Sequence, residues 1–312
     1  MLDFSNSKIL IVGDVMLDKY YFGKVDRISP EAPVPIVNIQ KEESRLGGAS
    51  NVANNIVSLG GHSLLCGVIG HDLFGKEIER ISRHKNIDTF LLKTSSPTIT
   101  KARIIGGKQQ IVRVDYEDKS ELNADNKKLF RDTISRILPE YDILVISDYG
   151  KGLISEDLCR YLIKLAHKYD KKVIIDPKGK NWEKYSGADI VTPNVKELSD
   201  IVGYTVPNTD RAIEKAAREA ITNNHLTALL VTRSDKGMSL IGPIPPIHIP
   251  THSEDVFDVS GAGDTVVATL GLCLAAGFEI SEAMRTANIA AGIVVKKIGT
   301  ATLTIEELVQ QK

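Results

Sequence analysis

Short apolar runs rich in β-branched residues recur along this chain, separated by stretches with helical periodicity. The runs are apolar throughout, which is typical of parallel strands buried on both faces of a sheet. We expect strands at Lys8–Val12, Ser63–Ile69, Ile143–Ser147, Lys172–Ile175, Ile190–Thr192 and Leu229–Thr232. We expect helices at Ser50–Leu59, Gly75–His84, Asp125–Leu138, Ser155–Tyr169, Asp210–Asn223, Gly261–Ala276 and Ser281–Val295. This alternation predicts an α/β fold with a doubly wound, mainly parallel sheet flanked by helices, whose ligands bind at the carboxyl ends of the strands.

Three other runs alternate polar and apolar residues, which indicates antiparallel strands with one solvated face: Val34–Gln40, Thr98–Ile105 and Gln109–Tyr116. They predict a small antiparallel β-lid, formed by segments at about 19–42 and 97–117, inserted in the N-terminal third of a single domain spanning 1–312. A sheet of two or three strands is marginal by itself and exposes apolar side chains. We therefore expect a homodimer formed through the β-lid.

The overall composition excludes several classes of protein. The chain has 39 basic and 40 acidic residues, so it lacks the positive charge of a nucleic-acid-binding or polybasic membrane protein. Its longest apolar run, Thr265 to Phe278, is too short to span a bilayer, and the N-terminus has no basic leader or long apolar core. Cys66, Cys159 and Cys273 lie apart in apolar surroundings, which favours buried reduced thiols over a metal site. We expect a cytoplasmic protein.

The segment Asp258 to Asp264 reads Asp-Val-Ser-Gly-Ala-Gly-Asp and leads into the apolar helix expected from Gly261. Small residues leave backbone N–H groups uncovered at a helix start, where unpaired donors and the helix dipole attract anions. Asp264 lies beside that position. An anion cradle next to a carboxylate base is what phosphoryl transfer from ATP to a hydroxyl requires. The alternative is a tight loop with an ordinary acid in the first helical turn.

Two motifs near the N-terminus could bind a hydroxylated ligand. Asp14 and Asp18 follow the first expected strand, and carboxylates at a strand end can accept paired hydrogen bonds from sugar hydroxyls. Gly47 and Gly48 precede a helix and would let the backbone approach a ligand closely, while Asn51 adds donors and an acceptor. The structural alternatives are an Asx turn for the first motif and a glycine-rich helix cap for the second.

Two later motifs follow strands and could contact a nucleotide. Thr192-Pro193-Asn194-Val195-Lys196-Glu197 closes one strand and opens a short helix. Asn194 and Glu197 could approach phosphates and a Mg²⁺ ion through water, or could form only a capping box. The polar turn from Val231 to Gly237 could be a nucleotide-binding edge or a simple hairpin loop.

In this order, these motifs resemble those of the ribokinase-like carbohydrate kinases, and the match runs from Gly13 to about Gly299. Closer still, four stretches resemble the kinase portion of D-glycero-β-D-manno-heptose 7-phosphate kinases: 13–18 (Gly-Asp-Val-Met-Leu-Asp), 27–35 (Arg-Ile-Ser-Pro-Glu-Ala-Pro-Val-Pro), 147–152 (Ser-Asp-Tyr-Gly-Lys-Gly) and 176–179 (Asp-Pro-Lys-Gly). Val259 stands where much of the wider family has Thr, a departure that heptose kinases share.

The resemblance implies a role for each matched residue. Asp264 would be the general base, and the N–H groups of Gly261, Ala262 and Gly263 an anion hole. Residues matched to nucleotide binding are Asn194, Val195, Lys196, Glu197, Ser234, Gly237 and Asn288, with Glu197 near Mg²⁺. Residues matched to the sugar are Asp14, Asp18, Gly47, Gly48 and Asn51. A phosphorylated acceptor also needs cations, for which the candidates are Lys101, Arg103, Arg113, Lys151 and Lys178, each of which could equally be a solvated surface charge.

The resemblance further implies ATP and Mg²⁺ as cofactors, a monovalent cation such as K⁺ as a common activator, and a sugar phosphate as acceptor. Heptose kinases are often fused to a C-terminal adenylyltransferase, and we expect that partner on a separate chain because the sequence stops shortly after Gly299. One alternative is a kinase for a different sugar or sugar phosphate. Another is a sugar-binding regulator without catalysis, against which the intact Asp264 argues. A dehydrogenase is disfavoured because Gly13-Asp14 does not extend to a dinucleotide-binding glycine motif.

Overall fold

The structure is a computed structural model that describes residues 2–251 and 256–311. Its body is built on a nine-stranded sheet with the strand order β13-β12-β11-β10-β9-β8-β1-β4-β5. The pairs from β11 to β5 are parallel, and β12 and β13 are antiparallel to their neighbours. These strands are β1 (Lys8–Gly13), β4 (His62–Gly70), β5 (Asp88–Thr94), β8 (Ile143–Ser147), β9 (Lys172–Asp176), β10 (Ile190–Val191), β11 (Leu229–Thr232), β12 (Met238–Ile241) and β13 (Ile247–Ile249). The expected mainly parallel sheet is confirmed.

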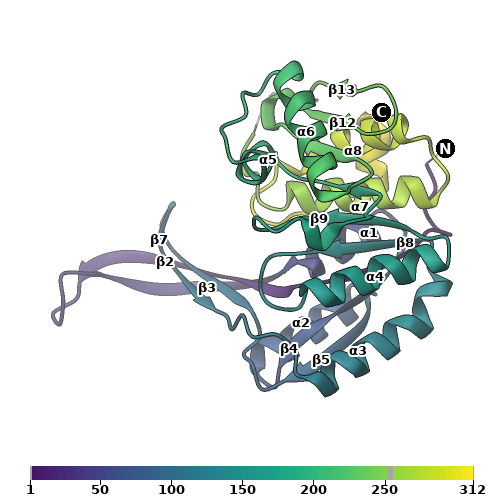
Figure 1. Cartoon of the computed structure of the whole chain (residues 1–312). Coiled ribbons are helices and arrows are strands. Elements are labelled where there is room, and N and C mark those ends of the chain that lie inside the picture. Colours follow the sequence, from purple (N-terminus) through teal and green to yellow (C-terminus); the bar gives the residue numbers. More distant parts are fainter. Residues whose placement is uncertain (1, 252–255, 312) are drawn as a thin grey trace.

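Helices cover both faces of this sheet, because alternate side chains of its central strands enter two separate apolar cores. In β1, Ile9 and Ile11 belong to one core, and Leu10 and Val12 to the other. The first core includes residues of α1 (Ala49–Ser58), α2 (Leu73–His84), α7 (Ala262–Ala275), α8 (Ile280–Val294) and α9 (Ile305–Gln311). The second includes residues of α3 (Ala124–Ile137), α4 (Glu156–Lys168), α5 (Val195–Val202) and α6 (Asp210–Asn224). Figure 1 shows these helices packed around the sheet.

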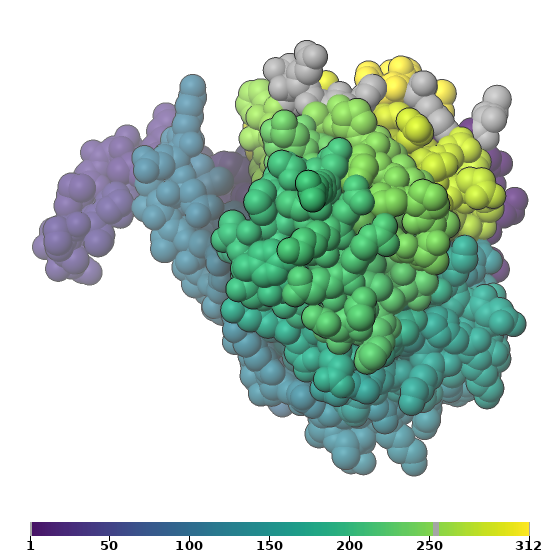
Figure 2. All heavy atoms as spheres, turned by 45° about the horizontal axis from the view of Figure 1, so that its top comes forward, coloured from purple at the N-terminus to yellow at the C-terminus, as the bar shows by residue number. Residues whose placement is uncertain are grey.

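A second sheet, the β-lid, projects from the body and is clearly separate from it in Figures 1 and 2. It has the strand order β3-β2-β6-β7 and consists of β2 (Val15–Ile28), β3 (Pro35–Gly48), β6 (Thr100–Gly106) and β7 (Gln109–Tyr116). The pairs β2–β3 and β6–β7 are antiparallel as expected, but β2 and β6 run parallel. The expected lid is therefore present, with one parallel pairing inside it.

Four strands were not predicted from the sequence. The structural alternative for the segment that begins with Asp14 was an Asx turn, yet β2 starts one residue later, at Val15, and Asp18 lies within it. Strand β5 begins with polar residues at the edge of the main sheet, and β12 and β13 are only four and three residues long. Edge strands and short strands carry weak apolar patterns, because one side or one face meets solvent.

The three cysteines are buried and form no disulfide, as expected. Across residues 2–251 and 256–311, none of the helices combines the length and apolar character needed to cross a membrane.

The junction of β3 and α1 brings the lid and the body together. Gly48 has φ 55°, and a Cβ on it would lie 2.6 Å from the carbonyl oxygen of Asp14. A Cβ on Gly47 would lie 2.5 Å from Oδ2 of Asp18. The close approach expected of this glycine pair is thus made to the protein's own aspartates. The N–H of Ala49, the first residue of α1, also donates to the carbonyl of Asp14 at 3.1 Å, so the helix that carries Asn51 begins beside Asp14.

Candidate active site

Asp264 lies at the start of α7 and is held from both sides. The residue is 3% exposed. The Nδ2 group of Asn51, on α1, donates to Oδ2 at 2.7 Å, and the hydroxyl of Tyr149, after β8, donates to Oδ1 at 2.7 Å. A carboxylate with one donor on each oxygen has a fixed plane and still keeps lone pairs that can accept another proton. The geometry therefore suits a general base.

Burial raises the pKa of Asp264 to about 6 from its ordinary value of 3.8, although the hydrogen bonds from Asn51 and Tyr149 act in the opposite direction. Asp18 raises this pKa further and Lys101 lowers it. A carboxylate with a pKa near 6 is ionised at neutral pH and takes up a proton more readily than an ordinary aspartate.

Asp14 is the single residue between β1 and β2, and it is also buried. Its Oδ2 accepts the backbone N–H groups of Tyr149 at 2.8 Å and Lys151 at 3.0 Å, whereas its buried Oδ1 has no partner among the described residues. Burial, followed by the charge of Asp148, raises the pKa of Asp14 to about 6. An unpartnered buried oxygen is costly unless a ligand supplies a donor. The expected role of Asp14 in binding a hydroxyl is consistent with this geometry.

The turn before α7 is shaped by Asp258. Its Oδ1 accepts the N–H of Ser260 at 2.9 Å, and its Oδ2 accepts the N–H of Gly299 at 2.8 Å. Gly261 has φ 79°, and a Cβ there would lie 2.8 Å from Nδ2 of Asn51, so this position needs glycine.

One part of the predicted anion hole is corrected by the structure. The N–H of Ala262 donates to the carbonyl of Val259 at 3.2 Å and is therefore occupied. Within residues 2–251 and 256–311, we find no acceptor for the N–H groups of Gly261 and Gly263. Of the three N–H groups predicted to bind an anion, these two are left as candidates.

The lid contributes basic side chains close to Asp264. The guanidinium of Arg103 donates to Oδ1 of the buried Asp18 at 2.7 Å. The ammonium of Lys101 lies 5.5 Å from the centre of the Tyr149 ring, and we find no ion-pair partner for it in the part of the chain that the structure describes. Burial lowers the pKa of Lys101, as do the charges of Lys151, Arg103 and Arg113, while Asp18 raises it. Four cations thus act on one region of the lid, which is typical of a place that receives an anion.

Two of the other predicted cations are already paired. Arg113 forms a bidentate pair with the neighbouring Asp115 at 2.8 and 3.0 Å and is half exposed. Lys151 pairs with Glu117, at the end of the lid. Their roles towards a substrate phosphate remain predictions.

The Asn194–Glu197 motif forms the capping box that was its structural alternative. Oδ1 of Asn194 accepts the N–H of Glu197 at 2.8 Å, and Oε2 of Glu197 accepts the N–H of Asn194 at 3.1 Å. Oε1 of Glu197 accepts the ammonium of Lys178 at 3.0 Å. Lys178 and Lys151 therefore pair with different acids and do not meet at a common partner. Val195 packs partly into the second core and Lys196 is exposed, so neither side chain shows a site contact.

The turn from β11 to β12 is also the hairpin that was its structural alternative. Gly237 has φ 76°, and a Cβ there would lie 2.0 Å from the carbonyl oxygen of Ile249, so the hairpin needs glycine at this position. Ser234 has φ 56°, and the amide of Asn288 donates to the carbonyl of Pro250 at 2.7 Å. These contacts leave the nucleotide roles of Ser234, Gly237 and Asn288 as predictions.

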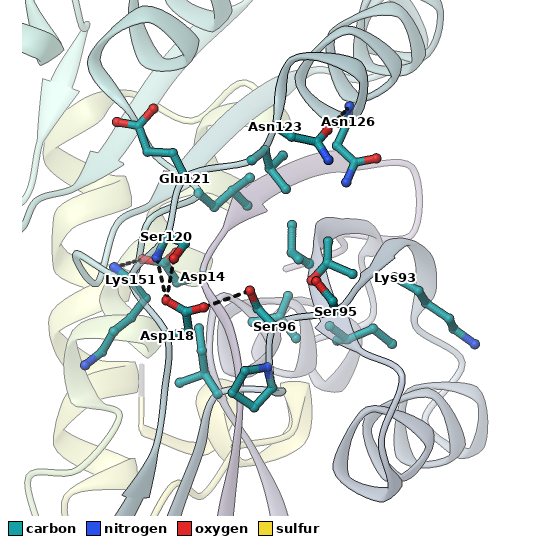
Figure 3. A pocket seen from close by; sticks show the side chains of 18 of the residues that line it. Asp14, Lys93, Ser95, Ser96, Asp118, Ser120, Glu121, Asn123, Asn126 and Lys151 are labelled. Atoms are coloured by element: carbon teal, nitrogen blue, oxygen red, sulfur yellow. Dashed lines mark hydrogen bonds between the residues drawn. The ribbon is translucent and has the colours of Figure 1, made fainter.

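A cavity of about 610 Å³ opens beside Asp14, at the carboxyl ends of β1, β4 and β5. Asp14 and Lys151 line it together with Ser96 and Asp118, which hydrogen-bond to each other at 3.0 Å (Figure 3). Asn123 and Asn126 line another part of its wall, as the figure shows. Hydroxyl, amide and carboxyl groups predominate among its polar side chains, a chemistry that suits a hydroxylated ligand.

The chain matches the pfkB family of carbohydrate kinases over residues 6–307. It is a pfkB-family carbohydrate kinase. The bifunctional protein HldE of Haemophilus influenzae is 46% identical over 98% of this chain, which spans only 63% of that relative's length. Among solved structures, phosphofructokinase-2 from Escherichia coli in complex with potassium has a TM-score of 0.79 at 20% identity, with 97% of both chains covered. Arabidopsis thaliana ribokinase complexed with ribose and ATP has a TM-score of 0.76 at 19% identity, with 98% of both chains covered.

Membership of this family confirms the expected ribokinase-like fold and the enzyme class, a phosphotransferase that uses a hydroxyl acceptor.

Two residues of this kinase's site were missed as site residues by sequence reasoning. Tyr149 and Asp176 appear in the sequence only as parts of motifs that carry the family resemblance, yet one contacts Asp264 and the other ends β9 in its vicinity. Burial raises the pKa of Asp176 well above its usual range, and the charges of Asp264 and Glu197 raise it further. The available signal was position, because Tyr149 closely follows β8, which lies next to β1, and Asp176 ends β9, which lies on the other side of β8.

The raised pKa of Asp264 predicts a cost in stability at neutral pH. A carboxyl whose folded pKa lies above its unfolded value stabilises the fold fully below the unfolded pKa, and this contribution is lost as the pH rises through the folded pKa. Asp264→Asn should therefore gain stability over the wild type as the pH rises from 4 to 8, by at most about 3 kcal/mol. Chemical denaturation at several pH values measures this.

The matched control for this measurement is Asp210→Asn. Hydrogen bonding to Arg233 lowers the pKa of Asp210, so the ionised Asp210 stabilises the fold at neutral pH. This contribution is lost as the pH falls, which is the opposite pH dependence to that of Asp264. A free-energy difference between Asp264→Asn and the wild type that does not change with pH would contradict the buried, high-pKa carboxylate.

Proposed function

We propose that this protein is an ATP-dependent sugar-phosphate kinase that phosphorylates O1 of D-glycero-D-manno-heptose 7-phosphate, giving the 1,7-bisphosphate used in ADP-heptose and lipopolysaccharide biosynthesis. The observation that carries the proposal is the buried Asp264 at a helix N-terminus, fixed by Asn51 and Tyr149. The similarity to HldE over nearly the whole chain supports the choice of acceptor.

In the proposed reaction the acceptor hydroxyl gives its proton to Asp264 as its oxygen bonds to the γ-phosphorus of ATP. The bond between that phosphorus and the oxygen bridging to the β-phosphate breaks, and ADP leaves. Phosphoryl transfer has a loose transition state, so alignment and charge neutralisation matter most. The N–H groups of Gly261 and Gly263 would receive charge on the transferred group, which in other enzymes is worth about 3–4 kcal/mol per donor.

Mg²⁺ supplies charge neutralisation at the ATP phosphates when bound. Asp176 and Glu197 are the acids that would attract such a cation, because the charges of Glu197 and Asp264 act on the buried carboxyl of Asp176 and raise its pKa. Within the residues that the structure describes, no three acidic, histidine or cysteine side chains are grouped to hold a metal by themselves. This agrees with a Mg²⁺ ion held largely by phosphates and water, with Glu197 in contact through water.

The acceptor would lie between Asp14 and Asp264, with its own phosphate towards the lid. Lys101 is the first candidate for binding that phosphate, because we find no ion-pair partner for it among the described residues. The other candidates are each paired with an acid and would have to exchange it for the phosphate: Arg103, Arg113, Lys151 and Lys178. The lid would then cover the sugar and exclude water, which limits ATP hydrolysis. We retain a kinase for another sugar phosphate as the second candidate, since the contacts of Asp14 and Asp264 do not select one sugar over another.

The first test is ADP release with Mg-ATP and a panel of acceptors: D-glycero-D-manno-heptose 7-phosphate, fructose 6-phosphate, ribose and fructose. We expect selective turnover of the heptose phosphate and a fall in kcat of about 10²- to 10⁴-fold in Asp264→Asn, because the base is lost. Selective turnover of another acceptor would contradict the heptose assignment and keep the base. No turnover of any acceptor would favour the regulator alternative.

A second test addresses the acceptor's phosphate. Lys101→Met should raise KM for the accepted sugar phosphate by about tenfold, because a charged hydrogen bond is lost, and should leave the Kd for ATP unchanged. Lys108→Met is the matched control, since Lys108 is exposed in the turn between β6 and β7 of the same lid. Equal effects of the two substitutions would contradict a specific role for Lys101.

We also propose that two copies of the chain associate through the lid. The lid exposes a set of large apolar side chains: Val25, Ile28, Val34, Ile39, Ile111, Val112, Val114 and Tyr116. Such a surface on a projecting sheet is more extensive than single exposed apolar residues and is typical of an interface.

Sedimentation velocity should give a dimer for the wild type at micromolar concentration and a monomer for Val112→Glu, because a charge would be buried in the interface. Leu129→Glu, on an exposed position of α3 outside the lid, should remain dimeric. A monomeric wild type would exclude the lid-mediated dimer.

Two further expectations belong to this proposal. Activation by K⁺ is supported by the potassium present in the Escherichia coli phosphofructokinase-2 structure, which has the same fold. The HldE relatives are bifunctional and longer than this chain, so the second activity in them is carried on the same polypeptide. An adenylyltransferase activity is proposed as the pathway partner of the present kinase.

A further inference from the structure

Tyr149 touches three parts of the site at once. Its hydroxyl donates to Oδ1 of Asp264, and its backbone N–H donates to Oδ2 of Asp14. Its ring lies under the ammonium of Lys101, which belongs to β6 of the lid, at 5.5 Å. The base, the acceptor-binding carboxylate and the lid therefore meet on one side chain and its peptide group.

The loop that carries Tyr149 is held in place by hydrogen bonds of the preceding residue, Asp148. Asp148 donates its backbone N–H to the carbonyl of Asp176, and its Oδ2 accepts the hydroxyl of Tyr185 at 2.7 Å and the ammonium of Lys184. Its Oδ1 accepts the N–H of Gly150 at 2.7 Å, and Gly150 has φ 65°. This network fixes the backbone on both sides of Tyr149, so its hydroxyl is directed at Asp264 without a ligand present.

We propose that Tyr149 is the positioning residue of the catalytic base: its hydroxyl fixes the orientation of the Asp264 carboxylate, and its ring seats Lys101 of the lid beside it. The proposal rests on the kinase function proposed above. It assigns no proton transfer to Tyr149, which acts through Asp264.

The chemistry of the phenol fits a permanent donor. Burial and the charge of Asp264 raise the pKa of Tyr149 well above its usual range, so the hydroxyl keeps its proton and does not compete as a base. The charged groups that face Asp264 are Asp18 from β2 and Lys101 from β6, and Asp176 faces it from the end of β9. Tyr149 and Asn51 are the two donors to its carboxylate, and a carboxylate deprived of one of them is free to rotate.

The first measurement compares Tyr149→Phe with Tyr149→Ala, using the best acceptor of the panel. Tyr149→Phe keeps the ring, so kcat should fall by about 10- to 100-fold, the range for losing one hydrogen bond to a charged group, with KM for the acceptor nearly unchanged. Tyr149→Ala also removes the seat of Lys101, so KM should rise in addition. The matched control is Tyr204→Phe, which loses a phenol-to-carboxylate hydrogen bond to Glu219 far along the chain, and it should keep both constants.

The second measurement does not depend on activity. Infrared difference spectra of the ligand-free protein, with Asp264→Asn used to identify the Asp264 band, give the protonation midpoint of this carboxyl. In Tyr149→Phe the midpoint should move to higher pH, because a hydrogen bond that stabilises the ionised form is gone. The melting temperature of each variant is recorded alongside.

The two measurements separate the proposals. A wild type that phosphorylates no acceptor would overturn the proposed function, while the spectroscopic midpoint would still decide the role of Tyr149. An unchanged midpoint in Tyr149→Phe overturns the positioning role whatever the rates, and so does an active wild type whose kcat Tyr149→Phe leaves within twofold. A raised midpoint together with a lower kcat supports it.

Discussion

The pair of hydrogen bonds on Asp264 is the interaction on which the rest of the site depends. It joins three segments that lie far apart in the sequence: Asn51 on α1, Tyr149 after β8, and Asp264 on α7. These segments meet because β8 lies directly beside β1, and α1 and α7 pack on the same face of the sheet. The strand order of the doubly wound sheet therefore brings the three segments together, and their side chains then form the hydrogen bonds of the site.

This arrangement buries several carboxylates close together, which lowers the stability of the fold. Asp14, Asp148 and Asp264 are all nearly inaccessible to solvent, and each is stabilised by a different set of donors. The donors do not fully compensate for burial, since the pKa values of Asp14 and Asp264 remain at about 6. Functional sites commonly keep such a local cost, because replacing the acids would remove the chemistry together with the strain.

The sequence predicted the fold and the place of Asp264 in the first turn of a helix, because both are local patterns: buried strand runs, and a glycine turn before an apolar helix. It did not predict contacts that depend on strand order. Asp176 is near Asp264 because β9 pairs with β8 in a register that sets Asp176 beside Ser147, which nothing in the local sequence encodes. The contact between Tyr149 and Asp264 was not predicted for the same reason, because it too depends on strand order. Asn194 and Glu197 show the converse, because their local pattern was equally compatible with a capping box, and a capping box is what they form.

The end of the lid that joins the body, here called its root, contributes residues to the site. Strand β2 begins one residue after Asp14, and its parallel pairing with β6 sets Lys101 directly beside Asp18. Arg103 then pairs with Asp18, and the charge of Lys101 acts on Asp264 and lowers its pKa. A movement of the lid about this root would change the distance from Lys101 to Asp264 with no intervening hinge. The strand register thus places Lys101 of the lid against the ring of Tyr149, whose hydroxyl donates to Asp264. If the proposed function holds, this contact would link the lid to the base.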